Sequence, residues 1–284
     1  MTYVISDLHG YPIEKLKMLL DKANFGEDDF LYILGDVVDR NGDGGVSILL
    51  WLLGQYNVQL ILGNHEAMLL SCDFVFDEIT EDSVAAMNSE KIELLNNYML
   101  NGGDVTLKAL RTIPREKQQD ILDYLRDCPL YEAVTAGGRD FILVHSGFDN
   151  FSKERKISDY SADELIWAWP ELEDEYYDDI HTVFGHTPTM NYGDEYKGKI
   201  IKTRTWTDID CGAAYGNEPV LLRLDDYKEF KLDDDDLFDH VTADVLERYK
   251  PAFEALAKCV EENKDLLDFL NDYDEKTDKT ERPD

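Results

Sequence analysis

Short apolar runs alternate with amphipathic segments over about the first sixty residues. The apolar runs are four or five residues long, the length of a strand, and cover Tyr3–Ser6, Phe30–Leu34 and Val58–Leu62. Between them, apolar residues recur at helical spacing over 13–23 and 46–53, and a glycine follows each segment. This alternation of strand and helix predicts two βαβ units on a parallel sheet.

A different pattern follows. Helical spacing dominates from Ala67 to Asp127, and no residue in this segment indicates chemistry. Strand patterns then return, with few helices between them, at Tyr131–Thr135, Asp140–Val144, Thr182–Phe184, Thr205–Ile209 and Val220–Leu224. A last strand, Tyr227–Leu232, would pair with its predecessor as a hairpin that turns at Asp225-Asp226. We therefore expect a mixed α/β fold of the α+β-like kind, with a mixed or second sheet in this half.

The last part of the chain opens with the acidic run Asp233–Asp236. Apolar residues at helical spacing predict a helix over about Thr242–Leu270, and the polar segment Asp272–Asp284 is typical of disorder. We therefore expect one domain over 1–232, followed by an acidic C-terminal helical extension over 233–284 with a disordered tail.

The charge balance narrows the choice of partners. The 284 residues include 28 basic and 61 acidic side chains, for a formal net charge of −33. A field of that sign repels nucleic-acid backbones and anionic membrane surfaces, so we expect neither as a partner. No run of ~18 apolar residues is present that would span a membrane.

The N-terminus and the cysteines indicate the compartment. The first seven residues contain no basic segment and no long apolar segment, so we expect no signal peptide. The four cysteines, Cys72, Cys128, Cys211 and Cys259, lie far apart with no CxxC pair. This spacing is typical of reduced thiols rather than of disulfides or a cysteine zinc site, and we expect a cytoplasmic protein.

Polar groups follow directly after five of the predicted strands. They stand in the segments Asp7–His9, Gly35–Arg40, Gly63–Glu66, His145–Gly147 and Gly185–His186. Ligands of α/β sheets bind at the carboxyl ends of the strands, so we expect these side chains to lie together.

Six of these residues form a candidate ligand set for two divalent metal ions: Asp7, His9, Asp36, Asn64, His145 and His186. Oxygen and imidazole ligands without a thiolate suit manganese, iron or zinc better than calcium. We expect Mn²⁺ in vitro, with iron or zinc as alternatives. In two-metal hydrolases the ions lie about 3.5–4 Å apart and lower the pKa of a bound water to ~7.

The motifs Asp-x-His, Gly-Asp-x-x-Asp-Arg, Gly-Asn-His-Glu, His-x-Gly and Gly-His, in this order, carry a family resemblance. Together they resemble the phosphoprotein phosphatase branch of the calcineurin-like metallophosphoesterases, from Thr2 to about Leu224. The segment Val183–Thr189, followed by Ile209–Gly212, is similar to bacterial members in particular. The resemblance implies a ββ sandwich of mixed sheets flanked by helices.

The resemblance also implies how the metals are held. One metal would be held by Asp7, His9 and Asp36. The second would be held by Asp36, Asn64, His145 and His186, with Asp36 as the bridge. A hydroxide that bridges the two metals would attack phosphorus in line, without a phospho-enzyme.

Further residues would act on the substrate. The resemblance implies that Arg40 binds the phosphoryl oxygens, because a planar guanidinium suits bidentate contacts. It also implies that Asn64 is a second substrate-binding residue. The same resemblance implies that His65 protonates the leaving group while Asp39 holds the charged imidazole. General acid catalysis of this kind contributes about 10²–10⁴-fold.

The sequence departs from the family at one substrate-binding position. Trp169 stands where the family usually carries a second phosphate-binding arginine, and it would instead stack on a base or another aromatic group. Arg155 and Arg204 are the alternatives for the missing guanidinium. The other tryptophans, Trp51, Trp167 and Trp206, are interpreted as core packing.

These features lead to a main hypothesis and two alternatives. The main hypothesis is a bacterial-type serine/threonine protein phosphatase that acts on a phosphorylated protein. Because Trp169 stands in place of the arginine, the first alternative is a symmetrical dinucleoside tetraphosphatase or another small-molecule phosphohydrolase of the same family. A remote alternative is a non-catalytic metal-binding scaffold, which predicts missing ligands or a missing general acid, whereas all of these residues are present.

Overall fold

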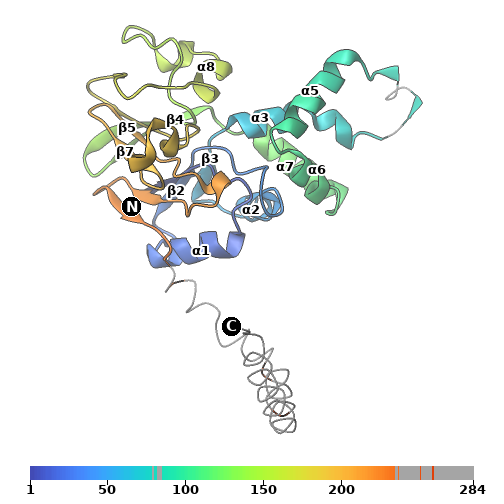
Figure 1. The fold of residues 1–284 in the computed structure, drawn as a ribbon, viewed down its shortest axis with the longest axis horizontal. Coiled ribbons are helices and arrows are strands. Elements are labelled where there is room, and N and C mark those ends of the chain that lie inside the picture. Colours follow the sequence, from blue (N-terminus) through green and yellow to red (C-terminus); the bar gives the residue numbers. More distant parts are fainter. Residues whose placement is uncertain (79, 82–84, 234–235, 237–249, 251–257, 259–284) are drawn as a thin grey trace, which may run out of the picture. The chain divides into compact units, whose positions relative to one another are not determined.

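The computed structural model describes residues 1–78, 80–81, 85–233, 236, 250 and 258 (Figure 1). The chain divides into two units, Met1–Lys231 and Leu232–Asp284. Apart from two single residues, the helix predicted at Thr242–Leu270 lies outside the described residues, and so does the predicted tail. No helix of the described part is long and apolar enough to cross a membrane.

The first sheet contains the two predicted βαβ units (Figure 1). Its strands have the order β10-β9-β1-β2-β3, with β1, β2 and β3 parallel and the β9–β10 hairpin antiparallel at the other edge. The strands are β1 (Thr2–Ile5), β2 (Phe30–Ile33), β3 (Val58–Leu60), β9 (Leu221–Arg223) and β10 (Lys228–Phe230). Two crossover helices join the parallel strands, α1 (Ile13–Lys22) and α2 (Val46–Leu52).

The second sheet contains the strands predicted in the middle of the chain. Its order is β4-β5-β6-β8-β7, with β5, β6 and β8 parallel and both edge strands antiparallel. The strands are β4 (Tyr131–Ala136), β5 (Arg139–Val144), β6 (His181–Phe184), β7 (Ile201–Lys202) and β8 (Trp206–Asp208). The sequence did not predict β7, because two residues are too short to show alternation.

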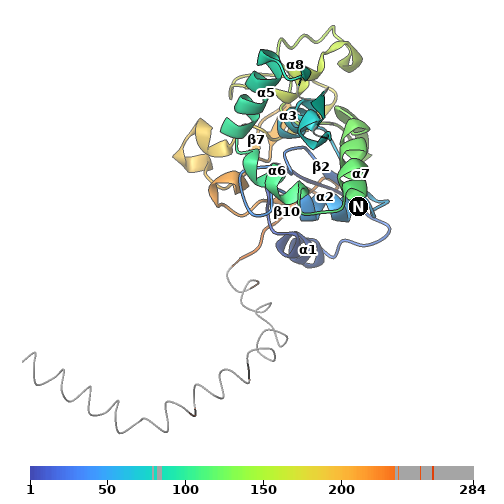
Figure 2. The ribbon, with the colours of Figure 1, turned by 90° about the vertical axis from the view of Figure 1, so that its right-hand side faces the viewer.

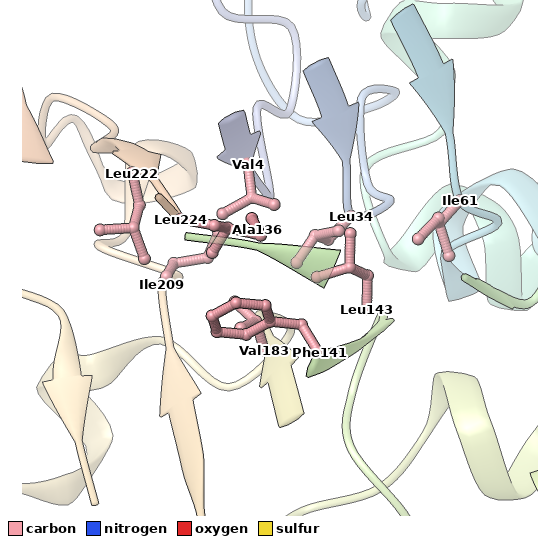
Figure 3. Close-up of a cluster of buried hydrophobic side chains, with 10 residues drawn as sticks. All are labelled: Val4, Leu34, Ile61, Ala136, Phe141, Leu143, Val183, Ile209, Leu222 and Leu224. Carbon is pink, nitrogen blue, oxygen red and sulfur yellow. The ribbon is translucent and has the colours of Figure 1, made fainter. Parts of the chain in front are cut away.

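The two sheets pack face to face around a shared hydrophobic cluster. Figure 3 shows Val4 from the first sheet above Phe141 and Leu143 from the second. Strand β5 has the period of two that such packing requires, because Phe141 and Leu143 face the first sheet while Ile142 and Val144 face outward. Burial of each such side chain contributes roughly 1.5–3 kcal/mol before entropy is counted.

Helices cover the outer sides of this sandwich. Helices α1 and α2 lie on the side of the first sheet away from the second (Figure 1), and Figure 2 shows another group of helices beside them. This group consists of α3 (Asn64–Ser71), α5 (Ser89–Leu100), α6 (Asp104–Leu110) and α7 (Arg115–Arg126). An aromatic cluster and α8 (Ala162–Ile166) cover the second sheet. The predicted sandwich of mixed sheets flanked by helices is confirmed.

Single 3₁₀ turns complete the connections. They lie at Asp73–Phe76, Ile157–Asp159, Thr189–Tyr192, Asp194–Tyr196 and Ala213–Tyr215. The long connections after β5 and β6 are therefore built mostly from turns, as the scarcity of helical pattern in this half predicts.

Candidate active site

The polar segments leave their strands through sharp backbone turns. Nine non-glycine residues of the described chain have a positive φ. Six of them are candidate site residues: Asp7, His9, Asp36, Asp39, Arg40 and His186. This conformation is unfavourable for residues with a Cβ and gathers at functional sites. The turns at the strand ends bring the side chains of both sheets to one place.

Asp36 lies at the centre of the site. Its Oδ1 is 3.5 Å from Nε2 of His145, and its Oδ2 is 3.5 Å from Nε2 of His9 and 3.9 Å from Nε2 of His65. Burial by itself would raise the pKa of this carboxyl, but the surrounding histidines, His186 included, hold the pKa below its usual value. One carboxylate is therefore shared between two groups of imidazoles.

The histidine tautomers leave ring nitrogens free to bind a cation. Nδ1 of His9 donates to the carbonyl of Val38 at 3.0 Å, and Nδ1 of His145 donates to the carbonyl of Leu34 at 2.7 Å. Burial lowers the pKa of His9 to about 3 and also lowers that of His145. In the neutral form of each ring, Nδ1 carries the proton and the lone pair on Nε2 faces Asp36, which is the arrangement of metal-binding histidines.

A second group of ligand atoms converges beside Asp36. Nε2 of His145 lies 2.8 Å from Oδ1 of Asn64 and 3.2 Å from Nδ1 of His186, and that Nδ1 lies 3.0 Å from the same Oδ1. Two sets within the described chain place three ligand atoms close enough for one ion: His9, Asp36 and His65, and Asp36, His145 and His186. The two sets share Asp36, as expected of a bridging ligand.

Asp7 belongs to neither set, yet its surroundings also fit a cation. Its Oδ2 accepts from the backbone N–H of His186 at 2.9 Å, while its buried Oδ1 has no partner. Burial, then Asp210 and Asp36, raise its pKa well above the usual value. Burying an unpaired carboxylate oxygen is unfavourable, and a divalent ion would compensate for it. The residues present therefore fit two divalent metal ions.

His65 and Asp39 form the predicted pair. Nδ1 of His65 donates to Oδ2 of Asp39 at 2.7 Å, and its Nε2 lies 3.2 Å from Nη2 of Arg40. Burial lowers the pKa of His65, but the negative charges of Asp36 and Asp39 outweigh it and raise the pKa overall. His65 lines the pocket next to the candidate phosphate-binding arginine, Arg40, whereas Asp39 is fully buried.

Two residues that hold Asp39 come from the helical segment where the sequence indicated no chemistry. The hydroxyls of Tyr98, on α5, and Thr106, on α6, donate to Oδ1 of Asp39 at 2.7 and 2.6 Å. The other oxygen of Asp39 is left for His65. A tyrosine and a threonine on amphipathic helices carry no motif, so only the tertiary contact identifies them.

Glu66 fixes the loop that carries Asp36. Its Oε1 accepts from the backbone N–H groups of Val37 and Val38, at 2.8 and 3.1 Å. Its Oε2 accepts from those of Asp36 and Gly63, at 2.8 and 3.1 Å. This buried carboxylate therefore joins the start of α3 to the loop after β2.

The two alternatives for the missing arginine are wrong. Arg155 pairs with Glu164 at 2.8 Å, and Arg204 pairs with Glu175 at 2.6 Å, both away from the pocket. Among the described residues that line the pocket, Arg40 is the one arginine or lysine.

The pocket combines buried ligand atoms with exposed rings. Its volume is about 210 Å³, and its lining includes Asp210, a buried acid that the sequence analysis did not assign to the site.

Two tryptophan rings lie against the His186 ring. The Trp169 ring is 4.9 Å from it, with 60% of the residue exposed, and the Trp167 ring is 5.9 Å from it, with 38% of the residue exposed. Trp206 is buried in the core, but the prediction for Trp167 was wrong, because α8 ends at Ile166 and the next residue turns toward the pocket.

Comparison with known proteins identifies the family. Residues 2–190 match the family of calcineurin-like phosphoesterases, which is more than half of the chain. The chain belongs to the calcineurin-like phosphoesterases. Its metal-ligating residue types and its two-sheet fold are both consistent with this family of hydrolases.

Individual relatives share one name. A symmetrical bis(5'-nucleosyl)-tetraphosphatase of Haemophilus influenzae is 24% identical over 274 residues, which cover 81% of this chain and 95% of that protein. A protein of the same name from Buchnera aphidicola is 39% identical over 72 residues, and the match spans only 26% of its length. The crystal structure of a candidate diadenosine tetraphosphatase has the same fold, with a TM-score of 0.52 and 18% identity over 81% of this chain and 92% of that one.

Proposed function

We propose that this phosphoesterase is a two-metal hydrolase that cleaves dinucleoside tetraphosphates symmetrically. The observation that carries the proposal is a pocket whose described lining contains one arginine and the exposed rings of Trp167 and Trp169. Trp169 stands where the family resemblance expects the second arginine. Nucleobases stack on such rings, whereas the side chain of a phosphoserine or phosphothreonine has no ring. The relatives named symmetrical tetraphosphatases support the same choice.

The metal ligands that we propose are those that the family resemblance implies, and the clustering of Asp36 with the histidines supports them. One ion would be held by His9, Asp36 and Asp7, and the other by Asp36, Asn64, His145 and His186. Two bound divalent ions would activate a water as a nucleophile and would neutralise charge on the phosphates. Because the net charge of the chain is −33, bound metal ions would be the main source of positive charge to offset the negative charge of a polyphosphate.

The chain's own residues would position and protonate the substrate. Arg40 would bind the phosphoryl oxygens with its guanidinium, together with the amide of Asn64. His65 would deliver a proton to the leaving oxygen from Nε2, the atom that lies next to Arg40, while Asp39 holds the ring through Nδ1. A cut at the middle of four phosphates leaves two phosphates on each nucleoside, so two nucleoside diphosphates are the expected products.

The test compares the two substrate classes on the same protein. After chelation and addition of Mn²⁺, we expect ADP as the nucleotide product from diadenosine tetraphosphate. If two bases contribute stacking, its kcat/KM should exceed that of a phosphothreonine peptide by about 100-fold or more. Asp36→Asn serves as the control and should abolish turnover of both substrates.

Other outcomes would overturn the proposal. Dominant turnover of the peptide would restore the protein phosphatase, and release of AMP with ATP would exclude a symmetrical cut. Turnover of neither substrate, with metal bound, would favour the metal-binding scaffold.

A further inference from the structure

Exposed aromatic side chains are concentrated at one place in the described chain. Four aromatic residues of the described chain are exposed: Tyr56, Trp167, Trp169 and Tyr215. Three of them line the active-site pocket, and only Tyr56 lies outside it. Rings that gather in this way mark a binding surface rather than incidental exposure.

Tyr215 and Trp169 contact different groups of the site. Its ring is 5.9 Å from the Arg40 guanidinium, whose Nη2 is 3.2 Å from the His65 ring. Trp169 instead packs on His186. His186 belongs to the group of His145 and His186, whereas His65 belongs to the group of His9 and His65. Asp36 lies between the two histidine groups. A series of contacts therefore runs from Tyr215 through the reactive centre to Trp169.

The local backbone presents the Tyr215 ring to the pocket. The residue ends a single 3₁₀ turn between Gly212 and Gly216, whose φ angles are 84° and 86°. The side-chain amide of Asn41 donates to the carbonyl of Ala214 at 3.1 Å, which ties this turn to the loop that carries Arg40. The ring is thus held by its backbone while 61% of the residue stays exposed.

We propose that Tyr215 forms a second nucleobase subsite, opposite the subsite of Trp167 and Trp169. This inference rests on the proposed function. A symmetrically cleaved dinucleoside tetraphosphate carries one base on each side of the reacting bond, so a ring at each end of the pocket would bind both. Two stacked bases would also centre the phosphate chain, which places the middle bond rather than an outer one at Asp36.

The test measures binding of substrates with two bases, one base and none. Tyr215→Ala and Trp169→Ala should each raise the KM for diadenosine tetraphosphate about tenfold, and the double variant about 100-fold, with kcat nearly unchanged. Adenosine 5'-tetraphosphate, used as a competitive inhibitor, can place its single base at either end. Each single variant should therefore raise its inhibition constant only about twofold, and the double variant about tenfold.

Three controls separate stacking from other effects. Tyr215→Phe should bind like the wild type because it keeps the ring. Tyr56→Ala removes an even more exposed ring outside the pocket and should change no constant. Inorganic tetraphosphate carries no base, so its inhibition constant should be the same for Tyr215→Ala and the wild type.

The possible failures are distinguishable. If the wild type releases no ADP from diadenosine tetraphosphate, the proposed function itself is wrong. If it does, but Tyr215→Ala leaves the KM unchanged, only the second subsite is wrong. If the inhibition constant for inorganic tetraphosphate rises in parallel with the KM, Tyr215 merely supports Arg40, and the inference is also overturned.

Discussion

At the scale of single residues, the Asp39 carboxylate is held by hydrogen bonds to both of its oxygens. It is fully buried, and its two oxygens have different partners: Oδ2 accepts from His65, and Oδ1 accepts from Tyr98 and Thr106. The two hydroxyls fix the plane of the carboxylate, and the carboxylate fixes the imidazole. We therefore regard Tyr98 and Thr106 as positioning residues for the proton transfer that we propose for His65.

This arrangement predicts a selective defect in Tyr98→Phe. The variant keeps the ring and one of the two hydroxyl donors, so the fold should persist while His65 is held less firmly. We expect kcat to fall about tenfold for phenyl phosphate, since a hydrogen bond to a charged group contributes about 1.5–3 kcal/mol. The kcat for 4-nitrophenyl phosphate should change little, because its leaving group needs little protonation.

Thr106→Ser provides the matched control, because it keeps the second hydroxyl and should behave like the wild type. Equal losses of kcat for the two phosphate esters in Tyr98→Phe would contradict the positioning role. Such a result would leave Tyr98 as a packing residue.

At the scale of elements, the loop after β2 depends on a helix that begins thirty residues later. The N-terminal turn of α3 carries Glu66, which accepts four backbone N–H groups from that loop and from Gly63. The loop contains Asp36, Asp39 and Arg40, each with a positive φ. Glu66 therefore compensates for backbone strain in the segment that carries much of the candidate chemistry.

Removal of this carboxylate should destabilise the domain strongly. Glu66→Ala leaves four buried N–H groups without acceptors, so we expect the free energy of unfolding to fall by about 3–5 kcal/mol. Glu66→Gln keeps one carbonyl oxygen and should show an intermediate loss. Urea unfolding of both variants measures the effect, and wild-type stability in Glu66→Ala would show that the loop is held by other contacts.

At the scale of the whole domain, the candidate metal site joins the two sheets. Asp7, Asp36 and Asn64 follow strands of the first sheet, whereas His145 and His186 follow strands of the second. Asp210, after β8, adds a third buried acid to Asp7 and Asp36. Bound divalent ions would therefore hold the sandwich together and offset the repulsion among these acids.

Metal removal should consequently destabilise the protein, and more so at higher pH. When the free metal concentration is about 100 times Kd, a bound ion adds about 2.7 kcal/mol to the free energy of unfolding. This raises the Tm of a domain of this size by roughly 5–10 °C. Burial raises the pKa of Asp210 to about 7, against about 3.9 for an unfolded Asp. Between these values the folded state binds a proton that the unfolded state has lost, so the stability of the chelated protein falls as pH rises.

The measurement is the Tm with EDTA and with Mn²⁺, from about pH 5 to about pH 8. We expect the gain from Mn²⁺ to grow with pH, and Asp210→Asn to reduce that growth. A gain that is independent of pH would contradict the role of buried acids. No gain at any pH would contradict metal binding at this site.

The sequence by itself determined the architecture and the set of polar residues. Apolar runs of strand length predicted the strands other than β7, because buried strands must be continuously apolar or alternating. Polar residues directly after those runs predicted that Asp7 and Asp36 lie close together, since β1 and β2 are neighbouring parallel strands whose carboxyl ends meet at one edge. The same pattern marked His145 as a candidate, but His145 follows a strand of the other sheet, so its approach to Asp36 depends on how the sheets pack. These predictions depend on short-range patterns that a chain displays without its tertiary contacts.

Only the tertiary structure decided the groups that come from elsewhere. Tyr98 and Thr106 lie far along the chain from Asp39, which they contact, and no local pattern marks them. Asp210 directly follows a predicted strand, as the candidate ligands do, but only the structure shows that it lines the pocket. The structure likewise excluded Arg155 as a replacement arginine and brought Trp167 to the pocket beside Trp169. A side chain's partner depends on which surfaces the folded sheets bring together, and this is set by the packing of the whole domain rather than by neighbours in sequence.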